Sequence, residues 1–365
     1  MKVLNISETT PGGIETFFES LSRAESVQND FLAFNYHRSI LRLKPKGFRP
    51  FNVLVLLWTL LFKLEIKQYQ VIFLHSTFAG FLRPFLWPFA KWHKVSVVFC
   101  SHGWSFNVHY SSKLKNTLYR SIYIGAERLL APFCDQIYCI SPSEYREAQK
   151  IGLKESKITL VWNGVQGSAL TLANRRWSVQ NQHSGVTRML FVGRLDMCKG
   201  LHLFIEALKQ LPKVDQPIEL SVIGEPVHND CPELYELLDS SIDNVTIKRL
   251  GWVKNSDLDQ HFQQADFVVV PSLWEGFGLI VAESLRNGTP VFASNAGSLA
   301  DMLNDKTGWV FNLESKTDLS QSIEKVLVDK AYLNISQQDC VEHFEQNFHE
   351  DIMNQRYFQS FSTLS

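Results

Sequence analysis

The sequence predicts two doubly wound α/β domains, in which a parallel sheet carries helices on both faces. Three observations lead to this class. The chain has 365 residues, of which 45% are apolar, and a domain typically takes about 100–200 residues. Short β-branched or aromatic runs alternate with longer helical stretches. A polar segment at 164–187, rich in Gly, Ser, Asn and Gln, separates the two halves and is typical of a linker.

In the first half, clusters of β-branched and aromatic residues predict strands at 2–7, 70–75, 96–101 and 136–141. The stretches between them predict helices at 14–22, 51–63, 78–91 and 114–131. The run 51–62 is almost continuously apolar but too short to span a bilayer. We therefore expect burial in the core to explain most of its positions.

In the second half, the same patterns predict strands at 188–192, 219–223, 245–250, 267–270, 290–293 and 308–311. Helices are expected at 199–210, 231–239, 256–264, 278–287 and 316–327. Ligands of doubly wound sheets bind beyond the carboxyl ends of the strands. We expect the site there, in a cleft between the two domains.

Several classes of protein are excluded. Disorder does not fit a formal net charge of −1 with 12% aromatic residues. No apolar window is long enough for a transmembrane helix, and the N-terminus reads as a strand without a signal-peptide core. Six cysteines without a CxxC pair suit a reducing cytoplasm and predict no structural zinc. Neither GxGxxG nor a Walker A motif is present, so an NAD enzyme or a P-loop ATPase is not expected.

The charge is divided unevenly along the chain. Residues 1–163 carry a formal charge of +9 and residues 164–365 carry −10. The window 38–128 carries +12 and holds 18 aromatic residues, which predicts an anionic partner. Nucleic acid lacks a supporting fold motif. An anionic membrane is favoured, because 81–94 interleaves aromatics with cations as interfacial segments do. The alternative is a core rimmed by Lys and Arg.

Two glycine-containing turns follow predicted strands. Gly12 and Gly13 open the first helix, where they suit either close backbone approach to an anion or a plain tight turn. Gly193 ends a strand in the second half and precedes Arg194 and Lys199. These two cations suit a pair of linked phosphates, although solvated surface charges remain the alternative.

A third loop combines carboxylates with glycines. Glu275, Gly276, Phe277 and Gly278 lie between a buried-looking strand and a helix that contains Glu283. Both carboxylates can face one pocket and accept hydrogen bonds from sugar hydroxyls, while the glycines suit a phosphate at the helix N-terminus. The structural alternatives are a favourable helix-end charge for Glu275 and a solvated helix face for Glu283.

The motifs occur in an order that resembles one family, the retaining nucleotide-sugar glycosyltransferases of family four with the GT-B fold. They are Gly12-Gly13, His102-Gly103, Ser141-Pro142-Ser143, Asn163-Gly164-Val165, Gly193-Arg194 with Lys199, Glu275 with Glu283, Gly288-Thr289-Pro290-Val291 and Thr307-Gly308. The resemblance covers nearly the whole chain. It implies two Rossmann-like domains that face a central cleft.

The resemblance implies a role for each matched residue. Arg194 and Lys199 would neutralise the donor diphosphate, Glu275 would hold the donor sugar and Glu283 the ribose hydroxyls. The remaining positions implied to contact the donor are Gly12, Gly13, His102, Gly193, Trp252, Val253, Gly276, Phe277, Gly278 and Leu279. Among them, Trp252 and Val253 would form the base-binding wall, and the amides around Gly278 would cradle the phosphate. His102, Glu275, Arg194 and Lys199 are the implied catalytic residues, and His102 would contact either the donor sugar or its phosphate.

The resemblance also implies a domain layout. An acceptor-binding domain would span 1–165, a linker 166–187 and a nucleotide-sugar domain 188–343. The segment 344–365 would be a helix that crosses back to the first domain. Gly224-Glu225-Pro226 departs from the glycine-rich turn of many relatives, which puts a donor contact from that loop in doubt.

We expect no cofactor and no metal. Asp257-Leu258-Asp259 matches the Asp-x-Asp pattern of metal-dependent glycosyltransferases. However, Ser256-Asp257 reads as a helix start, where such side chains cap free amides.

The expected function is transfer of a hexose-type sugar, with retention, from a nucleoside diphosphate sugar to a saccharide or lipid-linked acceptor. A UDP-sugar is favoured and a GDP-sugar is the alternative. The setting would be bacterial cell-envelope polysaccharide synthesis (lipopolysaccharide, O-antigen, capsule or exopolysaccharide) in the cytoplasm, at the inner face of the cytoplasmic membrane. The competing functions are a sugar-nucleotide epimerase, a glycosyl phosphorylase or a non-catalytic scaffold on the same fold.

Overall fold

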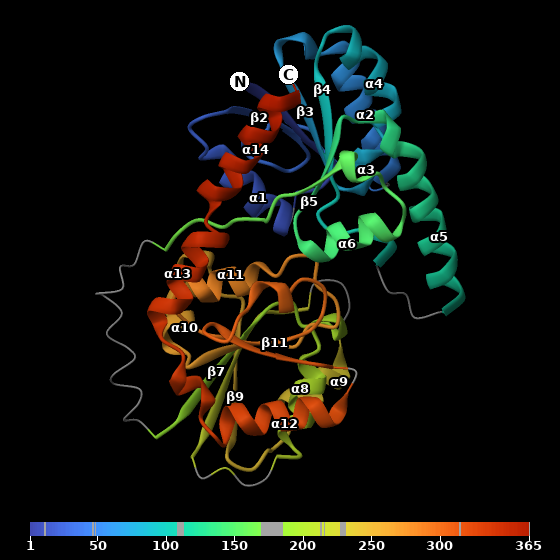
Figure 1. The fold of residues 1–365 in the computed structure, drawn as a ribbon. Helices are drawn as coiled ribbons and strands as arrows, with labels where there is room; N and C mark the ends of the chain where they lie inside the picture. The colour runs from blue at the N-terminus through green and yellow to red at the C-terminus, as the bar shows by residue number, and fades with distance from the viewer. Residues whose placement is uncertain are drawn as a thin grey trace. The chain divides into compact units, whose positions relative to one another are not determined.

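The computed structural model describes residues 1–364 except 11, 46, 48, 108–112, 169–184, 212–213, 215, 227–230 and 314. The chain forms two compact units. Unit 1 comprises Met1–Val165 with Glu350–Ser365, and unit 2 comprises Gln166–His349 (Figure 1). Each unit is one parallel sheet with helices on both faces, so the predicted fold class is confirmed.

The sheet of unit 1 has the strand order β2-β1-β3-β4-β5-β6, with every pair parallel. The strands are β1 Lys2–Ser7, β2 Gln28–Ala33, β3 Val71–His75, β4 Ser96–Cys100, β5 Gln136–Cys139 and β6 Ile158–Leu160. Two of them, β2 and β6, were not predicted. β2 begins with three polar residues and β6 has only three residues, so neither produces a strong strand pattern.

The helices of unit 1 are α1 Gly13–Ser22, α2 Arg49–Phe62, α3 Thr77–Gly80, α4 Arg83–Trp92, α5 Lys113–Leu130, α6 Pro142–Lys150 and α14 Glu350–Leu364. The single helix predicted at 78–91 is two helices, because Pro84 lies in the first turn of α4, where a missing N–H favours a helix start. The helix α6 was not predicted.

Core burial explains seven of the twelve positions in 51–62, as predicted, but not the other five. On α2, Asn52, Leu56, Thr59 and Leu60 are buried, and the partly buried Val53, Val55 and Leu57 pack against the core cluster. The large apolar side chains left exposed on this helix are Phe51, Leu54, Trp58, Leu61 and Phe62. A helix that packs on a sheet buries only the side chains on one stripe. Apolar residues on the rest of its circumference remain exposed to solvent.

The sheet of unit 2 has the order β12-β11-β10-β7-β8-β9 and is also entirely parallel. Its strands are β7 Thr187–Val192, β8 Ile218–Ile223, β9 Val245–Gly251, β10 Phe267–Val270, β11 Val291–Ser294 and β12 Gly308–Phe311. Its helices are α8 Leu201–Leu208, α9 Pro232–Leu238, α10 Asn255–Gln264, α11 Leu279–Arg286, α12 Lys316–Leu327 and α13 Gln337–Asn347.

The segment 344–365, expected as one helix, is divided between the units. α13 ends at Asn347 in unit 2, and α14 begins at Glu350 in unit 1. Most of the expected linker 166–187 lies outside the described residues, and Thr187 already belongs to β7.

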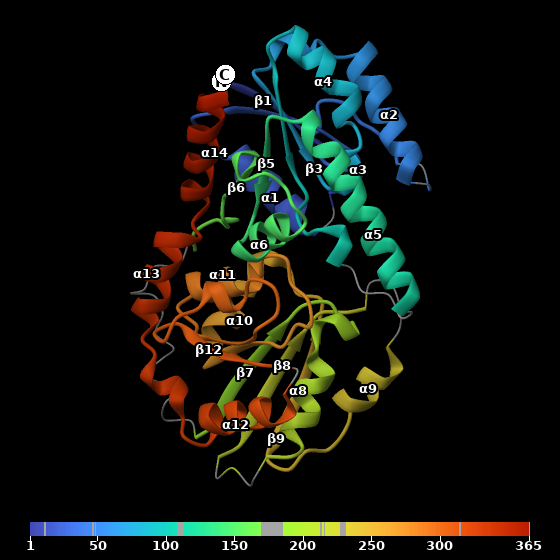
Figure 2. The ribbon, with the colours of Figure 1, turned by 45° about the vertical axis from the view of Figure 1, so that its right-hand side comes forward.

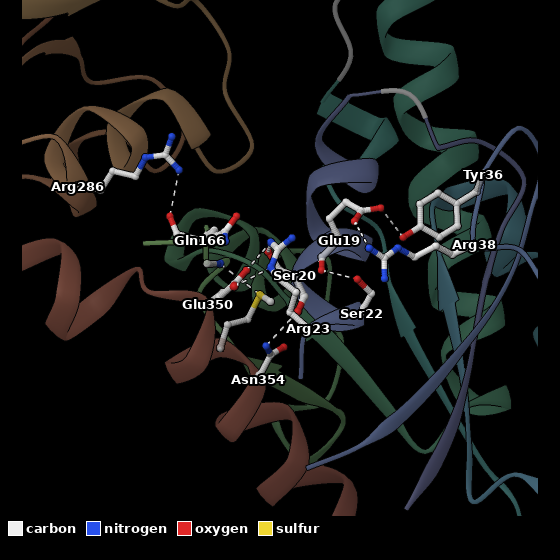
Figure 3. Close-up of polar contacts among 12 residues, drawn as sticks. Glu19, Ser20, Ser22, Arg23, Tyr36, Arg38, Gln166, Arg286, Glu350 and Asn354 are labelled. Atoms are coloured by element: carbon white, nitrogen blue, oxygen red, sulfur yellow. Dashed lines mark hydrogen bonds and ion pairs between the residues drawn. The ribbon is translucent and has the colours of Figure 1, made fainter. Parts of the chain in front are cut away.

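The helix α14 is tied to α1 within unit 1. Arg23 Nη2 lies 2.6 Å from Glu350 Oε2, and Asn354 Nδ2 donates to the Ser20 carbonyl at 3.2 Å (Figure 3). Tyr357 packs on Phe17 with ring centroids 5.7 Å apart. The last helix therefore covers the face of the sheet that also carries α1 (Figure 2).

Among the described residues, no helix has the length and apolar character needed to cross a bilayer.

Candidate functional site

The candidate site of unit 2 lies where its strand order reverses. β7 pairs with β8 on one side and with β10 on the other. The connections after β7 and β10 therefore start beside each other at the carboxyl edge and lead away in opposite directions. This is the position at which doubly wound sheets bind ligands. Arg194 and Lys199 follow β7, and Glu275 follows β10.

Lys199 and Glu275 meet at this edge. Lys199 Nζ lies 2.7 Å from Glu275 Oε2, with both side chains about one-fifth exposed. Ser272 Oγ donates to the same carboxylate oxygen at 3.3 Å. Arg194 lies on the same loop as Lys199, but its guanidinium pairs with Asp196 at 3.2 Å and is nearly half exposed. Lys199 and Glu275, both predicted from the sequence, are thus in contact, whereas Arg194 lies outside this contact and is more exposed.

Two glycines outside the predicted site residues lie where these loops contact each other. Gly200 has φ 67°, and a Cβ there would lie 1.8 Å from the Pro271 carbonyl oxygen. The loop that carries Lys199 therefore contacts the start of the Glu275 loop backbone to backbone. Gly297 has φ 59°, and its Cβ would lie 1.8 Å from the carbonyl oxygen of Glu275. A glycine directly after Lys199 was the available signal for the first, whereas nothing in the sequence pattern marks the second.

The stretch between Glu275 and α11 is fixed by contacts to other parts of unit 2. Ser298 Oγ donates to the carbonyls of Gly276 at 3.0 Å and Phe277 at 2.7 Å. The Phe277 ring is buried against Phe348, with centroids 6.1 Å apart. Gly278 caps α11 in the left-handed region, and Leu279 is its first residue. These contacts fix the loop on unit 2 and leave the N-terminal turn of α11 at the carboxyl edge.

Glu283 lies inside α11, in the second turn. Burial raises the pKa of its carboxyl to about 7, with Arg286 opposing this rise and Asp259 adding to it. The charged neighbours of Glu283 are therefore Arg286 and Asp259, and no hydrogen bond or ion pair within the described part of the chain joins it to Glu275.

The expected capping role of Ser256 and Asp257 is wrong. α10 is capped by Lys254, which makes no side-chain cap hydrogen bond, and Asp257 lies in the first turn. Asp259 instead accepts hydrogen bonds from Arg286 Nη2 at 2.5 Å and Asn287 Nδ2 at 2.8 Å. In the described ranges, no group of three or more His, Cys, Asp or Glu side chains is arranged to hold a metal ion.

The implied base-binding wall follows β9. Trp252 is 64% exposed and Val253 is partly buried. The adjacent loop, Gly224-Glu225-Pro226, is joined to its neighbours by backbone bonds. Gly224 N–H donates to the Gly251 carbonyl at 2.9 Å, and Leu195 N–H donates to the Glu225 carbonyl at 3.2 Å. Three neighbouring loops of the carboxyl edge are therefore one connected surface.

In unit 1, Gly12 and Gly13 lie at the equivalent edge. Gly12 has φ 90° and caps α1 without a side-chain hydrogen bond. Both glycines are exposed, and a Cβ on Gly12 would meet nothing within 4 Å. The backbone here is exposed, which close approach of an anion requires and a plain tight turn allows.

His102 follows β4 with φ 53°, a left-handed conformation that non-glycine residues rarely adopt. Its Nε2 lies 2.9 Å from His75 Nδ1, and His75 Nε2 lies 3.1 Å from Asn5 Oδ1. Asn5 Nδ2 donates to Asn29 Oδ1 at 3.0 Å, which leaves Asn5 Oδ1 as the acceptor. This order assigns the tautomers: each imidazole donates from Nε2, and Nδ1 of His102 is an acceptor.

Both imidazoles are neutral at pH 7. Burial lowers the pKa of His102 to about 3, and burial together with His102 lowers the pKa of His75 well below its ordinary value. The sequence motifs mark His102 but not Asn5. The signal that could have found it was its place on β1, the strand next to the one that ends in His75.

Comparison with known proteins matches both units. The model described as "Glycosyltransferase Family 4" matches residues 11–167, and the one described as "Glycosyl transferases group 1" matches residues 175–345. The chain is 27% identical over 374 residues, and over the full length of both chains, to an "uncharacterized 41.2 kDa protein in cps region" of Klebsiella pneumoniae. It is 26% identical to the UDP-Gal:alpha-D-GlcNAc-diphosphoundecaprenol alpha-1,3-galactosyltransferase of Escherichia coli, over 76% of this chain and 71% of that protein.

The fold has a solved counterpart in Anabaena Alr3699/HepE in complex with UDP, with a TM-score of 0.78, 18% identity and full coverage of both chains. The two family models together span most of unit 1 and unit 2. The chain therefore belongs to the glycosyltransferases of family four and has the GT-B fold.

Proposed function

We propose that this glycosyltransferase moves a hexose-type sugar from a nucleoside diphosphate sugar to a saccharide or lipid-linked acceptor of a cell-envelope polysaccharide. The Escherichia coli relative is named for a UDP-galactose donor and a diphosphoundecaprenol-linked acceptor. The Klebsiella relative is named for a cps region, and the HepE structures hold UDP and UDP-glucose. These names favour UDP as the donor nucleotide, with GDP as the alternative.

The observation that carries the proposal is the contact between Lys199 and Glu275 at the switch point of unit 2. A bound donor would break this ion pair and contact each of its partners. The donor diphosphate would accept hydrogen bonds from the ammonium of Lys199 and the partly exposed guanidinium of Arg194. The sugar hydroxyls would donate to the Glu275 carboxylate.

The chemistry follows from where charge develops. The bond between the anomeric carbon and the diphosphate oxygen breaks, and its electron pair leaves with the diphosphate. The acceptor hydroxyl oxygen bonds to the same carbon, and its proton passes to the departing diphosphate oxygen. Negative charge grows on the leaving group and positive charge on the sugar. Lys199 and Arg194 stabilise the negative charge on the leaving group, and Glu275 stabilises the positive charge on the sugar.

We assign His102 to the sugar rather than to the phosphate. A neutral imidazole whose Nδ1 accepts can take a hydrogen bond from a sugar hydroxyl, whereas a phosphate oxygen offers it no proton. Retention of configuration and independence of metal belong to the same proposal, and the two cations supply the charge that a metal would otherwise provide.

Two measurements test the proposal. Thermal shifts with UDP, GDP and ADP, each with and without EDTA, should show stabilisation by one nucleotide that EDTA does not change. Glu275→Ala should leave nucleotide affinity within about threefold yet lower transfer at least a hundredfold. Glu345→Ala, an exposed glutamate on α13, is the matched control. Unchanged transfer by Glu275→Ala would remove the assigned role, and no stabilisation by any nucleotide would contradict the donor site.

A further inference from the structure

Three helices of unit 1 expose large apolar side chains to solvent. They are Phe51, Leu54, Trp58, Leu61 and Phe62 on α2, Phe85, Phe89 and Trp92 on α4, and Leu114, Leu118, Tyr119, Ile122 and Leu129 on α5. Several lie largely in solvent, since Trp92 is 85% exposed and Phe62 is 72% exposed. Single exposed apolar residues are ordinary, whereas a gathered set marks a surface that meets a partner.

These side chains lie on one surface, because the three helices cover the same face of the sheet. Leu56 of α2, Leu86 of α4 and Tyr123 of α5 all pack into or against one core cluster with the sheet. Both ribbon views show α2, α4 and α5 on that face (Figures 1 and 2). Their opposite sides point away from the sheet, and we call this outward side the outer helix surface.

The outer helix surface is basic as well as apolar. α2 and α4 contain no acidic residue. The one acidic residue of α5, Glu127, is buried and paired with Arg83 at 2.7 Å. Cations lie directly beside the aromatic rings. Lys63 Nζ lies 4.7 Å from the centroid of the exposed Trp58 ring. Lys91 Nζ lies 4.4 Å from the centroid of the partly buried Trp87 and also pairs with Asp135 at 2.6 Å.

The positive charge of the outer helix surface favours an anionic bilayer over a second copy of this chain as its binding partner. A second copy docked through this surface would place two such basic surfaces against each other, which costs free energy. An anionic bilayer instead offers headgroup charge to the lysines and arginines and an apolar layer to the rings. α2 spans only about 21 Å at 1.5 Å per residue, shorter than the hydrocarbon core of about 30 Å, so it can lie along the interface but cannot cross it.

We propose that the outer helix surface of unit 1 binds an anionic membrane, with α2 and α4 lying in the interface and their aromatic side chains inserted among the headgroups and upper acyl chains. The sequence alone assigned this role to 81–94 and placed 51–62 in the core. The structure adds α2, which exposes five large apolar side chains against three on α4. The proposal rests on the proposed function only in that a lipid-linked acceptor would be met at this bilayer.

Flotation of the full chain with phosphatidylcholine vesicles, with and without phosphatidylglycerol, tests the proposal. The protein should float with the anionic vesicles and much less with the neutral ones, and high salt should release it. The double variants Trp58→Ser/Phe62→Ser and Phe89→Ser/Trp92→Ser should each lower the partition coefficient about tenfold or more. Val328→Ser/Leu333→Ser, on exposed positions of unit 2, is the matched control and should bind as the wild type does.

A charge series gives a second, independent readout. Lys63→Gln/Lys94→Gln/Lys115→Gln should lower anionic-vesicle binding about a hundredfold, at about fivefold for each cation near the surface. The matched triple variant Lys209→Gln/Lys325→Gln/Lys330→Gln lies in unit 2 and should have no comparable effect. All these lysines are exposed, so the melting temperature of each variant should stay close to that of the wild type.

Three outcomes would overturn the proposal. They are failure to float with either vesicle, equal flotation of the outer-surface and control variants, and a stable dimer in sedimentation that the α2 variant dissociates. The donor chemistry is read separately in the same samples. Nucleotide-induced stabilisation should persist in every variant, because Lys199 and Glu275 lie in unit 2. Loss of flotation with intact nucleotide binding, or the reverse, thus distinguishes failure of one proposal from failure of the other.

Discussion

The ammonium of Lys199 and the carboxylate of Glu275 form an ion pair of 2.7 Å across the two loops that diverge at the switch point of unit 2. They are 76 positions apart in the chain. The pair gives each charge an opposite partner within the protein. It also places a cation and a carboxylate side by side at the edge where the sheet binds ligands.

Replacing Lys199 with Gln should separate stability from donor binding. A partly exposed ion pair contributes at most about 1 kcal/mol to folding, so the melting temperature should change little. A charge-assisted contact to a diphosphate contributes more, and nucleotide affinity should fall about tenfold to a hundredfold. Calorimetric titration measures this, with the exposed Lys209→Gln as control. Unchanged affinity in Lys199→Gln would place the diphosphate elsewhere.

Glu283 should give donor binding a pH dependence near neutrality. Burial raises the pKa of this carboxyl to about 7, so it is protonated in mild acid and ionised above neutral pH. An ionised carboxylate accepts from two hydroxyls, and nucleotide affinity should therefore rise as the pH passes upward through about 7. Titrations between pH 5.5 and 8.5 should show about a severalfold rise that Glu283→Gln abolishes. The same rise in that variant would assign the titration to another group.

Acid should destabilise unit 1 through its two neutral histidines. The folded-state pKa of His102 is about 3, and that of His75 is also lowered, against an ordinary value of 6.5. Between pH 6.5 and 3 the unfolded chain binds protons that the folded chain does not. Stability from these groups is therefore complete above pH 6.5 and is lost as the pH falls.

Denaturant unfolding at several pH values measures this slope. His102→Asn removes one of the two groups and should make the acid loss shallower. Parallel curves for His102→Asn and wild type would contradict the neutral state of His102.

Gly200→Ala should be strongly destabilising. The added Cβ would lie 1.8 Å from the Pro271 carbonyl oxygen, and φ 67° disfavours any Cβ. We expect a loss of at least about 2 kcal/mol, which lowers the melting temperature by several degrees. Gly125→Ala is the control, because it lies inside α5 with nothing within 4 Å of the new Cβ. That change should be neutral or stabilising by up to about 1 kcal/mol. An equal loss of stability in both variants would contradict the close approach of Gly200 to the Pro271 carbonyl.

The elements that the sequence predicted well are those that one local pattern specifies. β1, β10 and β12 have the predicted bounds, because a short β-branched or aromatic run between turn residues rarely forms anything but a strand. β2 and α6 were missed for the opposite reason, since both are polar enough to resemble loops when read alone. Pairing in the sheet and packing on it stabilise both.

The sequence by itself determined the fold class and the order of the site motifs, including Gly193, Arg194 and Lys199 after one strand and Glu275 after another. These features depend on residue type and spacing along the chain. Only the tertiary structure decided that Lys199 reaches Glu275, that Gly297 supports the Glu275 backbone, that Asn5 and His75 orient His102, and that α2 leaves Trp58 in solvent. Each of these depends on which strands become neighbours and which helix face meets the sheet, and long-range pairing sets both.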